Sequence, residues 1–238
     1  MSRLIPIRFA DYDPKELKDI AGRLVVLVTP DGTMDQAARS ANRLSKGALA
    51  RLIASDGFSK AKTGQVISLA WPAGMQVEAL DVLVMPRRVT PIEARKAGAA
   101  LAKASAGKST TVMAGSMPKA ADLALGMALR TYTFEAHKTP SDSKTHGQVV
   151  IAHKAHEEMA AKFAPMLAVA EGVHMTRDLV NEPANVLTTS EFANRLVEME
   201  SIGLKVEVLD EAQLAELGMR TLLCVGQGSD SPSKVVVM

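Results

Sequence analysis

The chain has 238 residues, of which 47% are hydrophobic and 23% are charged, and its formal net charge is +2. This composition is that of an ordinary globular protein and differs from that of a disordered or a disulfide-rich chain. No window approaches the roughly 18 uninterrupted apolar residues that a membrane helix requires. Asp11 and Asp13 interrupt the N-terminal segment before an apolar run long enough for a signal peptide. We therefore expect no membrane partner.

The chain has a single cysteine, Cys224, which lies in the apolar run TLLCV. A thiol in such a run is expected to be buried and unreactive. Because one cysteine cannot form an intrachain disulfide, the sequence favours a reducing, cytoplasmic location.

Charge is distributed unevenly along the chain. Residues 1–150 contain 21 Lys and Arg against 13 Asp and Glu, a net +8, whereas residues 151–238 contain 7 against 13, a net −6. The change of sign predicts a domain boundary near residue 150. It also makes nucleic-acid binding by the first segment a hypothesis to be weighed.

Short apolar runs alternate with helix-like segments in the first 150 residues. The runs are bounded by Gly, Pro, Asp or Ser and predict buried strands at residues 23–29, 65–71, 79–86, 109–115 and 147–153. The segments between them, which contain much Ala, Leu, Lys and Arg, predict helices within residues 34–55, 91–105 and 119–138. This alternation predicts a three-layer α/β domain, with helices on both faces of a largely parallel sheet.

A change of organisation is expected after this domain. Residues 138–147 are the most loop-like segment, and the domain is predicted to span residues 1–153. A helical linker is predicted at 154–165, with Pro165 as the first residue of a second helix. Residues 166–238 then form the beginning of a further domain.

The segment TRDLVNEPANVL, residues 176–187, reads as a helix that ends abruptly. Pro183 disfavours the helical conformation at the residue before it, so the helix should end at about Asn181. Asn185 is a natural turn residue, and from the residues alone the whole cluster is best read as a rigid helix-to-helix turn without chemistry.

The elements after this turn are predicted from their caps. Thr188 and Glu191 fit a capping box, and Gly203 ends that helix. A strand at 204–209, a helix capped by Asp210 and a strand at 221–225 would then form a βαβ unit, with a last apolar strand at 234–238.

Three segments resemble the cytosolic leucyl aminopeptidase family. TRDLVNEPANVLTTSEFA (176–193) is similar to the signature that opens the family's catalytic domain, and VLDEAQLAELGMRTLLCVGQGSDSP (208–232) is similar to the next part of that domain. LALGMALRTYTFEAHK (123–138) is similar to the end of the family's N-terminal domain. The resemblance is tight over residues 172–232 and loose over 1–130, and Thr189 stands where the family often has proline.

The resemblance implies a macro-domain-like N-terminal α/β domain, a helical linker and an α/β metallopeptidase domain. It implies a cytoplasmic homohexamer that hydrolyses peptides with a free N-terminus, preferring leucine. Two divalent metals, typically zinc, manganese or magnesium, would activate a bridging water.

The family's metal ligands and catalytic residues lie in motifs of the forms K-G-x-x-F-D-x-G-G and N-T-D-A-E-G-R, and neither occurs in the chain. No residue here inherits a catalytic, metal-binding or cofactor-binding role from the family. We therefore expect a partial chain that is inactive alone and has a structural or assembly role.

Other candidates for chemistry are weak. His153 and His156 form an H-x-x-H pair that lacks the spacing and base of H-E-x-x-H, so a solvated face is expected there. His137, His146 and His174 are isolated, and the GQGS segment at 226–229 favours a turn over a phosphate cradle.

A binding module is the alternative function. The basic first domain could bind nucleic acid, or an ADP-ribose-like ligand if it is macro-domain-like. Its basic residues come singly or in pairs such as Arg87–Arg88 and Lys60/Lys62, without a basic run or interleaved aromatics. A dispersed solvated surface is therefore the preferred reading of the charge, and nucleic acid is an unlikely partner.

Overall fold

A computed structural model describes residues 4–139 and 147–238 of the chain. The described chain divides into two compact units, and the boundary in the sequence lies between Thr176 and Arg177. Most of the predicted loop at 138–147, including His146, lies outside the described residues.

The first unit is built on a six-stranded sheet with the strand order β1-β6-β5-β2-β4-β3. All neighbouring strands are parallel except β3 and β4. The strands are β1 (Ile7–Ala10), β2 (Arg23–Val28), β3 (Val66–Ala70), β4 (Ala79–Val84), β5 (Thr110–Gly115) and β6 (Val149–His153). The five predicted strands and the largely parallel sheet are confirmed, whereas β1 was not predicted, because its short run of residues carries no clear periodicity.

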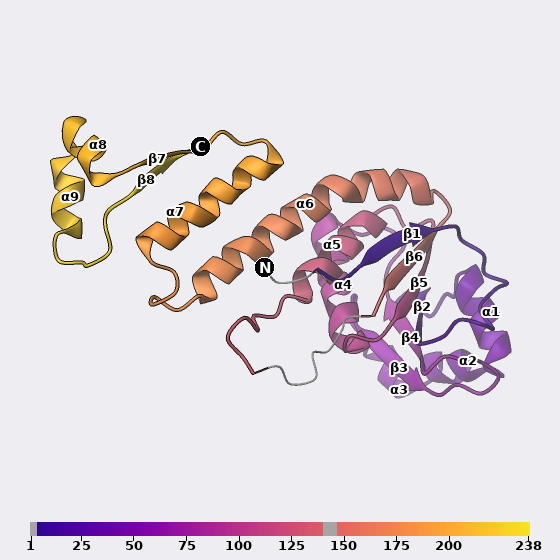
Figure 1. The fold of residues 1–238 in the computed structure, drawn as a ribbon. Helices are drawn as coiled ribbons and strands as arrows, with labels where there is room; N and C mark the ends of the chain where they lie inside the picture. The colour runs from indigo at the N-terminus through magenta and orange to yellow at the C-terminus, as the bar shows by residue number, and fades with distance from the viewer. Residues whose placement is uncertain (1–3, 140–146) are drawn as a thin grey trace. The chain divides into compact units, whose positions relative to one another are not determined.

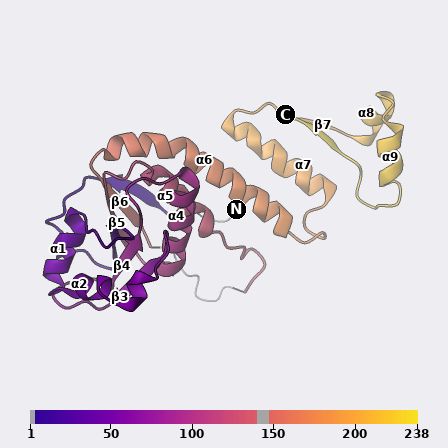
Figure 2. The ribbon, with the colours of Figure 1, turned by 180° about the vertical axis from the view of Figure 1, so that it is seen from behind.

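Helices cover both faces of this sheet (Figures 1 and 2). Val25, Val112 and Ile151 pack on one face against α4, α5 and α6, whereas Leu24, Val26 and other residues pack on the opposite face against α1, α2 and α3. The helices are α1 (Gln36–Leu44), α2 (Ala48–Ile53), α3 (Asp56–Ser59), α4 (Pro91–Ser105), α5 (Ala120–Arg130) and α6 (His156–Asn181). Burial on both faces explains why the strands are almost continuously apolar.

The helical stretch predicted within residues 34–55 contains two helices. Gly47 has φ +81°, in the left-handed region, and separates α1 from α2. Glycine adopts this conformation without the cost that a Cβ would impose. Thr90 and Glu93 form the capping box of α4, with Pro91 as the first helical residue.

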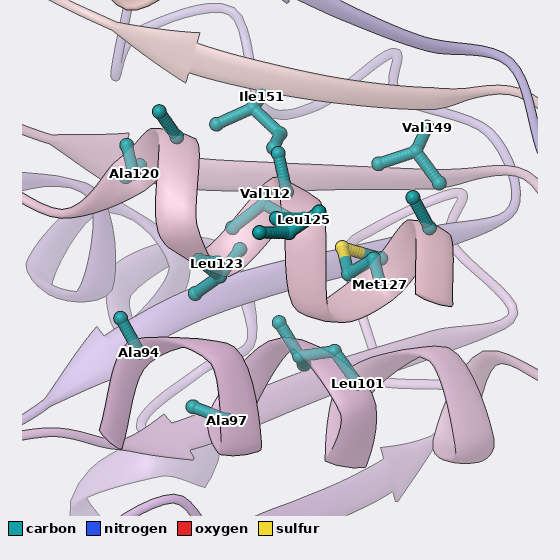
Figure 3. Close-up of a cluster of buried hydrophobic side chains, with 14 of the residues drawn as sticks. Ala94, Ala97, Leu101, Val112, Ala120, Leu123, Leu125, Met127, Val149 and Ile151 are labelled. Carbon is teal, nitrogen blue, oxygen red and sulfur yellow. The ribbon is translucent and has the colours of Figure 1, made fainter. Parts of the chain in front are cut away.

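Helices α4 and α5 lie side by side (Figure 3), and their main chains approach closely at two glycines. A Cβ on Gly98 would overlap the carbonyl oxygen of Leu123, and one on Gly126 would overlap that of Arg95. The Arg95 guanidinium also binds the Asp122 carboxylate, with an Nη2–Oδ1 distance of 2.9 Å. The helix pair therefore depends on two glycines at the crossing.

Helix α6 is one helix of 26 residues, so the prediction that Pro165 begins a second helix is wrong. Pro165 removes the N–H that would bond the Ala161 carbonyl. Both residues are exposed, so water can satisfy that carbonyl and the helix continues. Two valines of α6 face solvent, since Val169 is 61% and Val180 79% exposed.

The second unit contains short elements and a two-stranded antiparallel sheet. These are α7 (Thr189–Val197), the 3-10 helix η1 (Glu198–Ile202), β7 (Glu207–Leu209), α8 (Glu211–Glu216), α9 (Arg220–Gly226) and β8 (Val235–Val237). The predicted strand at 221–225 is helix α9, and the predicted βαβ unit is therefore wrong. A five-residue apolar run does not distinguish a strand from a short helix by periodicity.

The turn after α6 has the predicted shape. Helix α6 ends at Asn181, and the amides of Val186 and Leu187 both donate to the Pro183 carbonyl at 2.9 Å. The Thr188 hydroxyl caps α7 by accepting from the Glu191 amide at 3.3 Å. The Glu191 side chain instead binds Arg195, so half of the predicted capping box forms.

Candidate functional site

A cavity of ≈ 280 Å³ lies where the parallel strands β2, β4 and β5 end. We call it the strand-end cavity. Its polar lining residues are Thr29, Thr33, Asp35, Arg87 and Ser116. Its apolar lining residues include Leu27, Met34, Met85, Ala114 and Met117.

The topology explains why a cavity forms at this edge. The chain leaves β2 towards α1 on one face of the sheet and leaves β4 towards α4 on the other, after which it returns on the far side of β2 as β5. Connections that leave central strands in opposite directions create a crevice outside their carboxyl ends, which is the usual ligand site of open parallel sheets.

Asp35 lines the strand-end cavity. Its Oδ1 atom accepts a hydrogen bond from the Ala38 amide at 2.7 Å and so caps α1. A Cβ added to Gly115 at the end of β5 would lie 3.8 Å from Asp35 Oδ2, so the carboxylate sits beside that strand end. Burial raises the pKa of Asp35, although the amide of Ala38 opposes the shift.

Tyr12 lies next to this carboxylate. Its hydroxyl oxygen accepts from the Ala37 amide at 3.1 Å, and the same added Cβ on Gly115 would lie 3.7 Å from its ring. Burial, together with the nearby Asp35 charge, raises the pKa of Tyr12 to about 12. The phenol is therefore neutral at physiological pH and contributes no charge to the cavity.

Arg87 supplies the opposite charge from the segment after β4, where its side chain is exposed. Within residues 4–139 and 147–238, neither Asp35 nor Arg87 forms a salt bridge. The lining of the cavity thus combines a carboxylate, a guanidinium and apolar side chains, which suits a small amphiphilic ligand.

His153 and His156 do not form a joint site. His153 ends β6 and is 5% exposed, so the expected solvated face is wrong for this residue. The Ala155 amide donates to its Nδ1 at 3.0 Å, and its Nε2 lies 3.2 Å from the Met117 carbonyl oxygen. Both ring nitrogens are therefore used by the main chain, whereas His156 begins α6.

The remaining candidates lie on different segments of the described chain. His174 is buried, with its ring 5.1 Å from that of Tyr132, and His137 lies beside Phe134. Ser229 closes a turn by donating its amide to the Gly226 carbonyl at 3.0 Å, as expected for GQGS. Cys224 is exposed, so its predicted burial is wrong; the segment expected as a buried strand is α9.

The described part of the chain brings together no group of three or more His, Cys, Asp or Glu side chains that could hold a metal ion. It also contains no helix with the length and apolarity needed to cross a membrane. Arg87, Arg88, Lys60 and Lys62 are all exposed. The main signals missed from the sequence were Asp35 and Ser116, which could have been found as polar residues located after predicted parallel strands.

Comparison with family models identifies the class of protein. Residues 25–141 match the model of the cytosol aminopeptidase family's N-terminal domain, and residues 174–238 match the model of its catalytic domain. The chain belongs to the cytosol aminopeptidase family.

Curated relatives extend this match along the whole chain. A probable cytosol aminopeptidase of Dinoroseobacter shibae is 46% identical over 238 residues, covering 100% of this chain and 49% of the relative. One from Cereibacter sphaeroides is 45% identical, covering 100% of this chain and 48% of the relative. The chain therefore spans about half the length of these curated relatives.

Solved structures show the same fold. A tomato leucine aminopeptidase mutant matches with a TM-score of 0.80 at 20% identity, over 99% of this chain and 51% of that one. The bottromycin maturation enzyme BotP matches with a TM-score of 0.69 at 25% identity, over 91% of this chain and 45% of that one. A complex of BotP with Mn gives a TM-score of 0.66 at 24% identity, over 91% of this chain and 44% of BotP.

Proposed function

We propose that this chain is the N-terminal portion of a metal-dependent leucyl aminopeptidase, which in complete form removes N-terminal residues, preferably leucine, from peptides. The observation that carries this proposal is the order of the two family matches along one chain, together with 46% identity to a curated relative over its full 238 residues.

The residues present do not fit the two divalent metals, whether zinc, manganese or magnesium, that such an activity uses. The described residues contain no group of ligands for a metal, and the two ligand motifs occur nowhere in the 238 residues. We therefore assign metal binding and catalysis to sequence beyond these residues, and assign no catalytic residue here. The chain alone is proposed to be inactive and to serve folding and assembly.

The proposal extends to organisation and location. The domains are proposed as residues 1–153, a helical linker at 154–165, and the N-terminal part of the catalytic domain at 166–238. The complete protein is proposed to be a cytoplasmic homohexamer that acts on peptides. The names of the curated relatives support the cytosolic assignment.

An activity assay tests this proposal. The 238-residue chain and a version extended to the length of its relatives are incubated with leucyl-p-nitroanilide and added Mn²⁺ or Zn²⁺. The extended protein is expected to release p-nitroaniline in a metal-dependent manner, and the 238-residue chain is not. Metal-dependent turnover by the short chain, after host peptidases are excluded, would contradict the proposed division of labour.

The second candidate function is a binding module. The strand-end cavity favours a small ligand. Nucleic acid is disfavoured because the exposed basic residues, among them Arg87 and Lys60, form no continuous run. Heparin retention and gel-shift series at increasing salt test the nucleic-acid alternative. Binding that weakens steeply with salt would support that alternative and count against a dispersed surface.

A further inference from the structure

The strand-end cavity combines two charges of opposite sign, neither of which has a salt-bridge partner among the described residues. Asp35 comes after β2 and lies beside the end of β5, whereas Arg87 comes after β4 on the other side of β2. Two interstrand spacings of ~4.8 Å place these flanking strands about 10 Å apart, and the flexible Arg87 side chain can shorten that gap. A ligand between them would meet the Asp35 carboxylate, which accepts hydrogen bonds, and the Arg87 guanidinium, which is cationic and donates them.

The carboxylate of Asp35 lies near the Arg39 charge and the amides of Ala37 and Ala38, and it forms no salt bridge among the described residues. The N-cap bond to the Ala38 amide uses Oδ1, whereas Oδ2 is directed towards the end of β5. A partly desolvated carboxylate without a salt-bridge partner is stabilised by an ammonium group from a ligand. The neutral phenol of Tyr12 beside it does not compete for that ammonium group.

Size and lining restrict the ligand further. A volume of ≈ 280 Å³ lies at the small end of the ~300–1,000 Å³ typical of small-molecule sites, which favours a small ligand. The lining includes the apolar side chains of Leu27, Met85 and Met117 together with the hydroxyl groups of Thr29, Thr33 and Ser116. These features together favour a short molecule that carries an ammonium group, a carboxylate and an apolar side chain.

We propose that the strand-end cavity binds a free amino acid or dipeptide with an apolar side chain. Its ammonium group would meet Asp35, its carboxylate would meet Arg87, and its side chain would pack on Leu27, Met85 and Met117. The class of ligand is inferred from the cavity. Such molecules would also be products of the complete enzyme, which rests on the proposed function. The cavity would then be a site that senses product away from the metal centre.

Calorimetric titration of the 238-residue chain with L-leucine and leucylglycine tests the proposal. Two truncated probes, 4-methylpentanoate without the amine and 3-methylbutylamine without the carboxylate, are compared with leucine. The expected result is saturable binding of leucine or the dipeptide, with each truncated probe weaker by about tenfold or more, because each loses a charge-assisted contact.

Matched variants locate the site. Asp35→Asn keeps a good N-cap for α1 and removes the charge, and Arg87→Gln removes the guanidinium. Both are expected to weaken binding about tenfold or more, whereas Arg88→Gln, an exposed neighbour outside the lining, should not change it. Thermal melting of each variant verifies that it is folded.

Three outcomes would overturn the proposal. These are no binding of leucine or dipeptide at millimolar concentration by folded protein, equal binding by the Asp35→Asn and Arg87→Gln variants, or preferential binding of adenosine monophosphate. None of them depends on turnover. A failure of the proposed aminopeptidase function would appear only in the assay of the extended protein.

Discussion

Arg23 and Asp81 form a bidentate ion pair across the neighbouring strands β2 and β4. Arg23 Nε lies 2.8 Å from Asp81 Oδ2, and Nη2 lies 2.7 Å from Oδ1. The two side chains are only 16% and 2% exposed. Ser68 on β3 also donates to this carboxylate, so one group joins three strands of the sheet.

Asp81→Ala is therefore expected to lower the free energy of unfolding by about 3 kcal/mol, because it leaves the largely buried Arg23 charge without a carboxylate partner. Urea denaturation monitored by circular dichroism measures the change. Glu158→Ala, which breaks an exposed pair with Lys162 on α6, is the control and should have no measurable effect. Similar small changes in both variants would show that the buried pair contributes little.

The α4–α5 crossing makes a second prediction. Gly126→Ala places a methyl group on the Arg95 carbonyl, so the free energy of unfolding should fall by about 3 kcal/mol as the helices are forced apart. Gly172→Ala is the matched control, because a Cβ there meets nothing within 4 Å. It should instead stabilise α6 by about 1 kcal/mol. A neutral Gly126→Ala change would mean that the helices separate without cost.

The proline inside α6, Pro165, and the proline after its end, Pro183, should respond with opposite signs. Pro183→Ala is expected to lower stability by about 1 kcal/mol, since alanine makes the unfolded chain more flexible. Pro165→Ala removes the cost of ~3 kcal/mol that a proline imposes inside a helix, and it gives up the ~1 kcal/mol that proline contributes by restricting the unfolded chain. The free energy of unfolding should therefore rise by about 2 kcal/mol. Thermal melts compare the two variants. In an extended, active protein, a large loss of kcat for Pro183→Ala at unchanged Tm would contradict a purely structural turn.

Asp35 predicts a pH dependence. Burial raises the pKa of Asp35 in the folded chain above the ordinary value of 3.8. The protonated carboxyl therefore contributes stability below pH 3.8, and this contribution is lost as the pH rises through the raised pKa. Asp35→Asn should therefore be more stable than the natural chain at neutral pH, with the advantage shrinking towards pH 4 and below. Urea titrations at several pH values measure this difference. An advantage that does not change with pH would exclude the carboxyl as its cause.

Stability is expected to differ between the two units. Val25 and Val26 on β2 are fully buried, whereas Val237 on β8 is 50% exposed and β8 pairs only with β7 in the described chain. Amides of β7 and β8 should exchange with solvent much faster than those of β2. Hydrogen exchange with light scattering measures this. Equal protection in a monomeric sample would contradict the prediction.

The sequence predicted the first unit well and the second unit less well. In the first unit, each apolar run is bounded by turn residues and buried on both faces, so local pattern and tertiary environment agree. Residues 221–225 form α9 instead of a strand because so short a run leaves the choice to packing. Asp35 was not identified because an Asp before a helix is usually only a cap, and its place in a cavity depends on strands far away in the sequence.

The imidazole of His153 has a mechanical consequence for the strand-end cavity. One nitrogen binds the Met117 carbonyl, and Met117 itself lines the cavity; the other accepts from Ala155, immediately before α6 begins. The His153 ring thus joins the Met117 main chain to the residue before the first turn of α6. The N-terminus of α6 is therefore connected to the cavity through the side chain of His153. A ligand that displaced Met117 would also change the hydrogen bonding of the residue before α6.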